Sequence, residues 1–239
     1  ALSCSKRVVG AGQANPVVIV DETADLKKAA QDIVEGASFD NNIMCVSEKN
    51  LVVVSSVADA LAKEMEQLGV YYVRDEAEML KITKTVVTSG FTMNRAMEGK
   101  SADIILESSG IACSRDIRLI VVDTVLTHPF FSEEFLMPVV SMVRVDDFDE
   151  ALKTAIFIEQ GNRHTAMIHS QSIDHLNRAA HELKTSVFIK NGSSLEAIGF
   201  HGEQGASFTI ANITGEGVTT ARHFARRRRC TLTTGFAIR

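Results

Sequence analysis

The segment FDNNIMCVSEKNLVVV, residues 39–54, leads from a polar loop directly into a run of strand-forming residues. Its last four residues, LVVV, are continuously apolar, and Cys45 lies a short distance before them. An apolar run without polar alternation is typical of a strand that is buried on both faces of a sheet. The segment therefore predicts a buried strand, and it raises the question of whether the thiol before that strand is structural or reactive.

Apolar periodicity around this segment predicts an alternation of helices and strands. Apolar residues at 24–37 recur three and four positions apart, which predicts a helix with Asp21 and Thr23 as candidate caps. Further helices are expected at 57–68, 76–87, 148–160 and 173–183, and strands at 16–20, 51–56, 117–125, 139–145, 165–169 and 186–190. This order predicts an α/β fold with a largely parallel sheet and helices on both faces.

The composition excludes several classes of protein. With 239 residues, 45% hydrophobic and 23% charged, the chain has the composition of a soluble globular protein. A net charge of −5 gives no general attraction to nucleic acid or to an anionic membrane. The four cysteines are scattered without a Cys-x-x-Cys pair, which favours free thiols in a reducing compartment over disulfides or a metal site. No apolar run has the length of a membrane span, so we expect an intracellular protein without a membrane, nucleic-acid or metal partner. Because the sequence lacks an initial methionine, we also expect it to begin in mid-fold.

Cys45 has two interpretations on the residues alone. Free cysteine is among the most frequently buried residue types, which favours a structural thiol. A nucleophilic thiol must be partly exposed and needs N–H groups, a cation or a base beside it. Asn41, Asn42, Ser47 and Lys49 supply polar surroundings of that kind.

Histidines and carboxylates give further candidates. In GNRHTAMIHS (161–170), His164 stands at the start of an expected strand, where it is either a base or a structural hydrogen-bonding group. His169, His175 and His181 have no metal-ligand spacing, and we assign them no role.

Three other motifs are ambiguous. SEEFLMPVV (132–140) places two carboxylates before a proline, where they bind sugar hydroxyls or simply cap a loop. GAGQAN (10–15) lacks the glycine order and the following helix of a dinucleotide-binding loop. ARRRRC (225–230) is the one basic cluster, suited to phosphate, to solvent or to a subunit contact.

Taken in order, the segments at 10–49, 132–140, 161–170, 185–192 and 214–230 resemble the C-terminal half of an aldehyde dehydrogenase. More narrowly, they resemble the CoA-acylating aldehyde dehydrogenases of bacterial microcompartments, which serve propanediol or ethanolamine breakdown. The resemblance covers essentially the whole chain, and its most specific part is the run ASFDNN-x-x-C-x-x-EK around the cysteine.

The resemblance implies roles for three residues. Cys45 corresponds to the catalytic cysteine, whose thiolate attacks an aldehyde and later carries the acyl group as a thioester, with its own backbone N–H helping to hold the oxyanion. Glu134, four residues before Pro138, corresponds to the carboxylate that binds the nicotinamide ribose of NAD. His164 corresponds to the histidine of a Gly-x-x-His-Thr motif and would act as a base for Cys45 or for the thiol of coenzyme A.

One departure from the wider family implies the acyl acceptor. Hydrolytic aldehyde dehydrogenases carry a glutamate base shortly before the cysteine, and Gly10 stands at that place here. Without a carboxylate to activate water, the thioester should persist until the coenzyme A thiol attacks it. The implied reaction is the NAD-dependent oxidation of propionaldehyde or acetaldehyde to the acyl-CoA.

The resemblance also implies an organisation and a setting. Residues 1–20 would end a dinucleotide-binding domain, 21–221 would form the catalytic domain, and 222–239 would be an oligomerisation segment. We expect a homo-oligomer in the cytoplasm, inside a bacterial microcompartment with its shell or lumen proteins as partners. Because most of the NAD site lies upstream in the family, the chain alone should be inactive or nearly so. Three alternatives stay open: a hydrolytic aldehyde dehydrogenase, an acyl-phosphate reductase of the same fold, and a non-enzymatic interaction module acting through the arginines.

Overall fold

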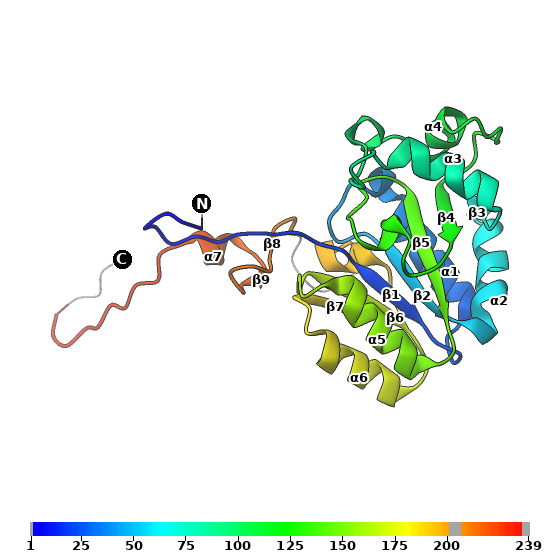
Figure 1. The fold of residues 1–239 in the computed structure, drawn as a ribbon. Coiled ribbons are helices and arrows are strands. Elements are labelled where there is room, and N and C mark those ends of the chain that lie inside the picture. The colour runs from blue at the N-terminus through cyan, green and yellow to red at the C-terminus, as the bar shows by residue number, and fades with distance from the viewer. Residues whose placement is uncertain (1, 201–206, 236–239) are drawn as a thin grey trace.

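A seven-stranded sheet forms the centre of the protein in a computed structural model, which describes residues 2–200 and 207–235 (Figure 1). The strand order is β3-β4-β5-β2-β1-β6-β7, and every neighbouring pair is parallel. The strands are β1 (Val17–Val20), β2 (Asn50–Val54), β3 (Val70–Val73), β4 (Leu119–Asp123), β5 (Val139–Val145), β6 (Thr165–His169) and β7 (Val187–Lys190). This confirms the predicted α/β class with a parallel sheet.

Helices cover both faces of the sheet, which explains why its central strands are apolar throughout. The helices are α1 (Leu26–Ser38), α2 (Ser55–Glu66), α3 (Glu76–Val86), α4 (Ala102–Ser108), α5 (Phe148–Glu159) and α6 (Ile173–Leu183). In β1, Val18 and Val20 pack with α1 and α2, whereas Val17 and Ile19 pack with α5 and α6. The alternation of side chains along a strand thus serves two apolar layers, and β1 and β2 are buried at every position.

Several expected elements agree closely with the structure, and others were missed. The ranges of β5, β6 and α6 are those expected from the apolar pattern. The sequence did not predict β3 or the seven-residue helix α4. The expected caps of α1 were wrong: Asp25 caps the helix by accepting a hydrogen bond from the backbone N–H of Lys28. Asp21 instead accepts hydrogen bonds from the backbone N–H and the hydroxyl of Thr23.

Residues 207–235 project from this body as an arm that runs beside the N-terminal segment (Figure 1). The arm contains a two-stranded antiparallel sheet, β8 (Ile210–Ala211) and β9 (Gly217–Val218), and the short helix α7 (Ala221–Phe224). The backbone N–H of Gly10 donates to Thr214 Oγ1 over 2.9 Å, and that of Gly12 donates to Asn212 Oδ1 over 2.8 Å. These bonds tie the two segments of the arm together.

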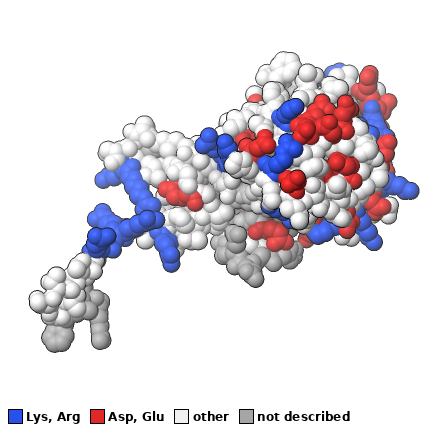
Figure 2. Space-filling view, turned by 90° about the horizontal axis from the view of Figure 1, so that it is seen from below, with Lys and Arg blue, Asp and Glu red and all other residues white. Residues whose placement is uncertain are grey.

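The arginine cluster lies on this arm. Arg226 to Arg229 are all exposed, and Figure 2 shows blue side chains gathered along the arm, whereas the body carries both signs of charge. None of the described helices has the length and apolar character needed to cross a membrane.

Candidate active site

Cys45 lies at the edge of the sheet where the parallel strands begin. The chain leaves α1, passes through the short 3-10 helix η1 (Phe39–Asn42) and reaches Cys45 before it enters β2. Strand β2 is central, between β1 and β5, so the loops that precede these strands meet at the same edge. These loops carry Ala14, Cys45 and Glu134, and they form the amino edge of the sheet.

Three consecutive residues before Cys45 have left-handed backbone conformations. Asp40, Asn41 and Asn42 have φ angles of 47°, 51° and 60°. Asparagine and aspartate tolerate this region better than other non-glycine residues. The buried side chain of Asn42 fixes the turn, because its Nδ2 donates to the carbonyl groups of Ala37 (2.7 Å) and Glu48 (3.0 Å). The loop that carries Cys45 is therefore closed at both ends by one amide.

Cys45 and Glu134 line one small cavity of about 330 Å³. Apart from these two polar groups the lining side chains are apolar: Ile43, Met44, Val46, Leu136, Ile198 and Phe208. Cys45 is partly exposed, which satisfies the access that a nucleophile needs. The cavity thus combines a thiol, a carboxylate and an apolar wall, and that wall suits the alkyl group of a small substrate.

Burial raises the pKa of Cys45, and the nearby Glu134 carboxylate raises it further. Two effects oppose this rise: a hydrogen bond from the Cys45 backbone N–H and the positive charge of Lys49. The thiolate is the reactive form, so these two groups favour nucleophilic attack.

Glu134 is a carboxylate whose interactions are incomplete. Burial raises its pKa, while Lys49 and a hydrogen bond from the Ala14 backbone lower it. Its Oε1 is buried and has no hydrogen-bond partner among the described residues. Buried polar atoms are nearly always paired, so an unpaired oxygen at a cavity indicates a place for a ligand that donates a hydrogen bond.

Glu48 and Lys49 hold the cysteine loop to its neighbours. The Glu48 carboxylate accepts hydrogen bonds from the backbone N–H (2.8 Å) and hydroxyl (2.7 Å) of Ser194. Ser194 begins the 3-10 helix η4 (Ser194–Ile198), whose Ile198 lines the cavity. Complete burial raises the pKa of Glu48 to about 7 and lowers that of Lys49 to about 8.

His164 lies immediately before β6, buried, and it is not among the residues that line the cavity with Cys45. Its Nδ1 is 2.9 Å from Thr165 Oγ1, and its Nε2 is buried without a partner among the described residues. Burial lowers its pKa to about 4, so the imidazole is neutral at physiological pH. The structure brings Cys45 and Glu134 together in one cavity and leaves His164 outside its lining.

The other candidates lie apart from this cavity. Gly10 is in the arm segment, and His175 pairs with Asp21 at the opposite edge of the sheet, with its Nδ1 2.7 Å from Asp21 Oδ2. Within the described ranges, no three His, Cys, Asp or Glu side chains are grouped as a metal site.

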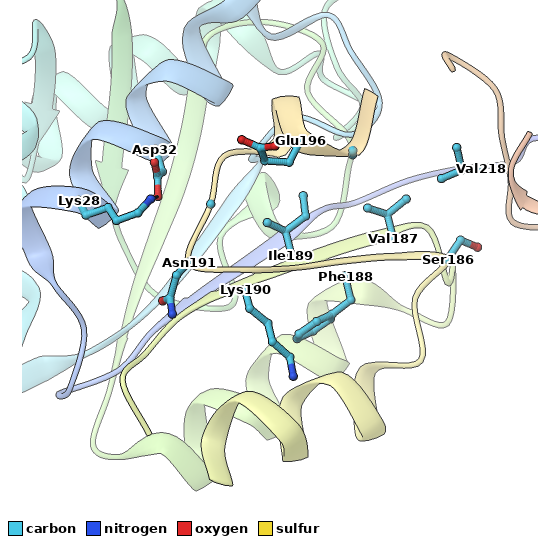
Figure 3. A pocket seen from close by; sticks show the side chains of 12 residues that line it. Lys28, Asp32, Ser186, Val187, Phe188, Ile189, Lys190, Asn191, Glu196 and Val218 are labelled. Atoms are coloured by element: carbon cyan, nitrogen blue, oxygen red, sulfur yellow. Dashed lines mark hydrogen bonds and ion pairs between the residues drawn. The ribbon is translucent and has the colours of Figure 1, made fainter. Parts of the chain in front are cut away.

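A second depression, the β7 groove, follows the open edge of the sheet (Figure 3). Its volume is about 720 Å³, and it is lined by Lys28, Asp32, residues 186–192, Glu196, Ala197 and Val218. Figure 3 shows Val187 and Ile189 on one side of the strand and Phe188 and Lys190 on the other. The groove is separated from the cavity of Cys45 by η4, which contributes residues to both.

Sequence reasoning did not find the buried roles of Asn42, Glu48 and Lys49. Lys49 in particular was expected only as one of the polar neighbours of Cys45, and it proves to be buried, with 3% of its surface exposed. The signal that could have found it is the pair of opposite charges directly before the apolar run of β2, because a charge so placed enters the interior with the strand.

The protein is thus a parallel α/β protein that holds a partly exposed thiol and a buried carboxylate in one cavity at the amino edge of its sheet. The sequence model of the aldehyde dehydrogenase family matches residues 3–217, and the chain belongs to that family.

Several curated relatives act on small aldehydes. The chain is 47% identical over its full length to propanal dehydrogenase (CoA-propanoylating) of Salmonella typhimurium, of which it covers 51%. It is 45% identical, over 98% of its length, to the acetylating acetaldehyde dehydrogenase EutE of the same organism, again covering 51% of that protein. The chain therefore spans about half the length of the curated relatives it matches.

Solved structures agree with this assignment. Propionaldehyde dehydrogenase of Rhodopseudomonas palustris, with bound CoA and an acylated cysteine, superposes with a TM-score of 0.93 at 42% identity. That match covers 96% of this chain and 52% of the other. A propionaldehyde dehydrogenase from the fucose utilisation microcompartment of Clostridium phytofermentans also gives a TM-score of 0.93 at 42% identity, covering 100% of this chain and 55% of that one.

Proposed function

We propose that this chain forms the catalytic half of a CoA-acylating aldehyde dehydrogenase that oxidises propionaldehyde or acetaldehyde with NAD. The observation that carries the proposal is the small apolar cavity in which Cys45 faces the incompletely bonded Glu134. The relatives described above as CoA-propanoylating and acetylating support the choice of acyl acceptor.

Cys45 is the proposed nucleophile. Its thiolate adds to the aldehyde carbon and forms a carbon–sulfur bond, and the carbonyl oxygen becomes an oxyanion that the Cys45 backbone N–H stabilises. Loss of a hydride from this carbon to the bound nicotinamide cofactor would convert the adduct into a thioester on Cys45. The acylated cysteine of the Rhodopseudomonas palustris enzyme supports an acyl-cysteine state in this family. The CoA thiol gives up its proton to a base and attacks the thioester carbon, so that the acyl group leaves with CoA and the Cys45 thiolate is restored.

Glu134 is the proposed contact to the nicotinamide cofactor. Its unpaired, buried Oε1 fits a ribose hydroxyl, which would donate the missing hydrogen bond. When bound, the cofactor supplies the acceptor for the two electrons that leave the aldehyde. An engineered glycolyl-CoA reductase with bound NADP+ superposes with a TM-score of 0.93 at 43% identity, which supports a nicotinamide cofactor of this kind. We propose NAD as that cofactor on the resemblance.

The residues around Cys45 favour CoA over water as acyl acceptor. Among the described residues that line the cavity, Glu134 is the one carboxylate, and the proposed ribose contact occupies it. Gly10, the counterpart of the hydrolytic glutamate, lies in the arm segment and carries no base. Water without a base attacks a thioester slowly, so the acyl group waits for a thiol.

His164 stays our proposed base for the Cys45 or CoA thiol. Burial lowers its pKa to about 4, which keeps the imidazole neutral and makes it a weak base in this chain, and its Nε2, unpaired among the described residues, is the atom that would take the proton.

We also propose the domain division given above, with one adjustment. Strand β1 (Val17–Val20) lies at the centre of the sheet, which favours a catalytic domain that starts at about residue 17 and not at 21. Residues 222–239 stay the proposed oligomerisation segment, and those described, up to residue 235, lie in the arm.

The β7 groove is the proposed place for a second copy of the chain. Among the described strands β7 has a neighbour on one side only, so its other edge presents backbone groups that can bind an added strand. The extended arm of another protomer is a segment of suitable shape. A cytoplasmic enzyme inside a microcompartment, beside shell or lumen proteins, is proposed from the microcompartment enzyme of Clostridium phytofermentans.

Activity is tested in a chimera in which this chain replaces the corresponding half of the propanal dehydrogenase of Salmonella typhimurium. We expect Cys45→Ala to abolish CoA-dependent NADH formation from propionaldehyde, and the matched Cys113→Ala to retain it. Turnover by the Cys45→Ala chimera would refute the proposal.

Two comparisons separate the alternatives. A hydrolytic enzyme would run equally well when CoA is omitted, and an acyl-phosphate reductase would require phosphate in place of CoA. A nucleic-acid module acting through the arginines would shift RNA or DNA in a gel at low salt.

A further inference from the structure

Lys49 is a charged side chain in the interior, next to the proposed active site. It is 3% exposed and lies four residues after Cys45, directly before β2. Lysine is almost never buried without partners, because the ammonium group loses its hydration. The contacts that stabilise Lys49 therefore reveal what the structure uses it for.

Three carbonyl oxygens surround the ammonium group. Lys49 Nζ donates to the backbone oxygen of Asn42 (2.5 Å), to the side-chain oxygen of Asn42 and to the backbone oxygen of Phe135 (3.0 Å). An ammonium group has three donors, so its hydrogen bonds are complete. Within the described part of the chain, no carboxylate oxygen forms an ion pair with Lys49.

These three bonds join two loops. Asn42 belongs to the left-handed turn that leads to Cys45, and Phe135 directly follows Glu134. One side chain thus bonds both the segment before the thiol and the segment of the carboxylate. Asn42, in turn, closes the cysteine loop through its amide, so Lys49 and Asn42 act on the same turn.

The positive charge of Lys49 is left to act through space. Three titratable groups face it, Glu134, Cys45 and Glu48, and all three raise its pKa against the larger effect of burial. In return, Lys49 lowers the pKa of Cys45 and of Glu134. An ammonium group that is bonded only to neutral oxygens keeps more of its field for these neighbours than one paired with a carboxylate.

We infer that Lys49 is a positioning residue: its ammonium group fastens the loop of Cys45 to the loop of Glu134 and holds one fixed positive charge beside both. The inference rests on the proposed function for the reaction that this arrangement serves. We call the three hydrogen bonds of Lys49 and its positive charge beside Cys45 and Glu134 the clamp. The clamp is a property of the folded chain, and it can be measured without aldehyde, NAD or CoA.

The first test measures how fast iodoacetamide alkylates Cys45 in the 239-residue chain as a function of pH. Cys4, Cys113 and Cys230 are replaced by serine so that one thiol reacts. We expect Lys49→Met to move the midpoint of the rate profile upward by about one pH unit, since the thiolate loses a neighbouring cation. Lys49→Gln should do the same, because it keeps donors but no charge.

Two variants control this measurement. Lys49→Arg keeps the charge and should keep the midpoint near that of the parent. Lys63→Met removes an exposed lysine from the last turn of α2 and should leave the profile unchanged. A lysine with a purely structural role would alter the unfolding temperature in both the Met and Gln variants and leave the midpoint in place, and that result would overturn the inference.

A second measurement covers the case in which the Lys49 variants do not fold. Coupling between two sites is reciprocal, so the Glu134 carboxylate must raise the pKa of Lys49 as much as Lys49 lowers that of the carboxyl group. We expect the lysine titration, followed by NMR of ¹³C-labelled side chains, to shift downward for Lys49 in Glu134→Gln. An unchanged Lys49 titration would also overturn the inference.

The outcome separates from that of the proposed function. A shifted alkylation profile together with an inactive chimera would retain the clamp and reject the reaction. An active chimera with an unshifted profile would retain the reaction and reject the clamp.

Discussion

The two edges of the parallel sheet differ in how completely their buried polar side chains are hydrogen-bonded. At the carboxyl edge, Asp21 accepts hydrogen bonds from both the N–H and the hydroxyl of Thr23, and a third from His175. Asp123 likewise accepts from Tyr72 (2.8 Å), Arg74 (3.2 Å) and Arg144 (2.9 Å).

At the amino edge, some polar side-chain atoms are buried without a hydrogen-bond partner among the described residues. The three buried side-chain atoms without a partner in the described part of the chain are Ser47 Oγ, Glu134 Oε1 and His164 Nε2, and all three belong to this edge. Unpaired buried atoms cost free energy, so natural proteins tolerate few of them. The hydrogen bonds at the carboxyl edge therefore stabilise the fold, whereas the amino edge holds buried polar atoms that are left free to bind a ligand.

The largest expected effect comes from exchanging matched carboxylates at the two edges. Glu134→Gln in the chimera removes the charge offered to the cofactor, and we expect turnover to fall by about 100-fold, or about 3 kcal/mol. Stability should stay the same or rise, because a buried, incompletely bonded carboxylate is lost.

Asp123→Asn is the matched control for this experiment, and it should give the reverse. It weakens bonds to two arginines and should lower the free energy of unfolding by about 1–3 kcal/mol while turnover stays near that of the parent. Turnover and denaturant unfolding of both variants check the contrast, and equal loss of turnover in both would break it.

A second prediction concerns Asp21 at the carboxyl edge. Asp21→Ala leaves His175 and Thr23 without their acceptor, so the free energy of unfolding should fall by about 3 kcal/mol. The alkylation rate of Cys45 in the folded state should not change, because this network lies at the opposite edge. Urea unfolding followed by circular dichroism measures the loss; a variant as stable as the parent would contradict the assigned role.

A third prediction uses pH. Burial lowers the pKa of His169, the last residue of β6, to about 4. The unfolded chain binds this proton near pH 6.5, so stability is complete above that pH and is lost as pH falls toward 4. Between pH 7 and 5 the loss from this residue is about 2 kcal/mol.

His169→Gln should flatten the pH dependence of stability by that amount. His181→Gln, at an exposed position on α6, is the control for the loss of one imidazole from the surface. Urea midpoints at the two pH values provide the measurement, and identical slopes in parent and His169→Gln would show that the histidine is not buried neutral.

The smallest expected effect is at Gly36, inside α1. A Cβ there would overlap the carboxylate of Glu48 and the hydroxyl of Ser194, which are bonded to each other. Alanine normally stabilises a helix by about 1 kcal/mol over glycine, but displacement of buried groups costs about 1–3 kcal/mol. We expect Gly36→Ala to lower stability by about 1 kcal/mol, whereas Gly90→Ala, where a Cβ meets Thr88 Oγ1 at an ordinary contact distance of 3.7 Å, should not. A stabilised Gly36→Ala would show that the Glu48 contact yields easily.

The fold was readable from the sequence wherever an apolar pattern met a clear boundary. Strand β5 begins directly after Pro138, and α6 lies between the capping Ser172 and a left-handed Lys184, so both were predicted with their observed ends. Strand β3, VYYV, has two half-buried tyrosines and no long apolar run, because it lies at the sheet edge. Helix α4 is too short to repeat its apolar positions.

The site was readable only in part. Motifs led to Cys45 and Glu134, which lie 89 positions apart and share a cavity. The burial of Lys49 depends on a carbonyl group from a distant loop, that of Phe135, and no local pattern encodes such a contact. Interactions between loops of different strands thus set the limit of what the sequence predicts.

The short 3-10 helix η4 connects the cavity of Cys45 with the β7 groove. Its residues line both the cavity of Cys45 and the β7 groove, and Ser194 anchors it to Glu48. A partner that binds the groove and favours one arrangement of η4 changes the free energy of ligand binding in the cavity. A ligand in the cavity then changes the free energy of partner binding in the groove by the same amount. If the proposed second copy binds the β7 groove, a lone subunit and an assembled one would therefore differ in the affinity of the Cys45 cavity for its ligands.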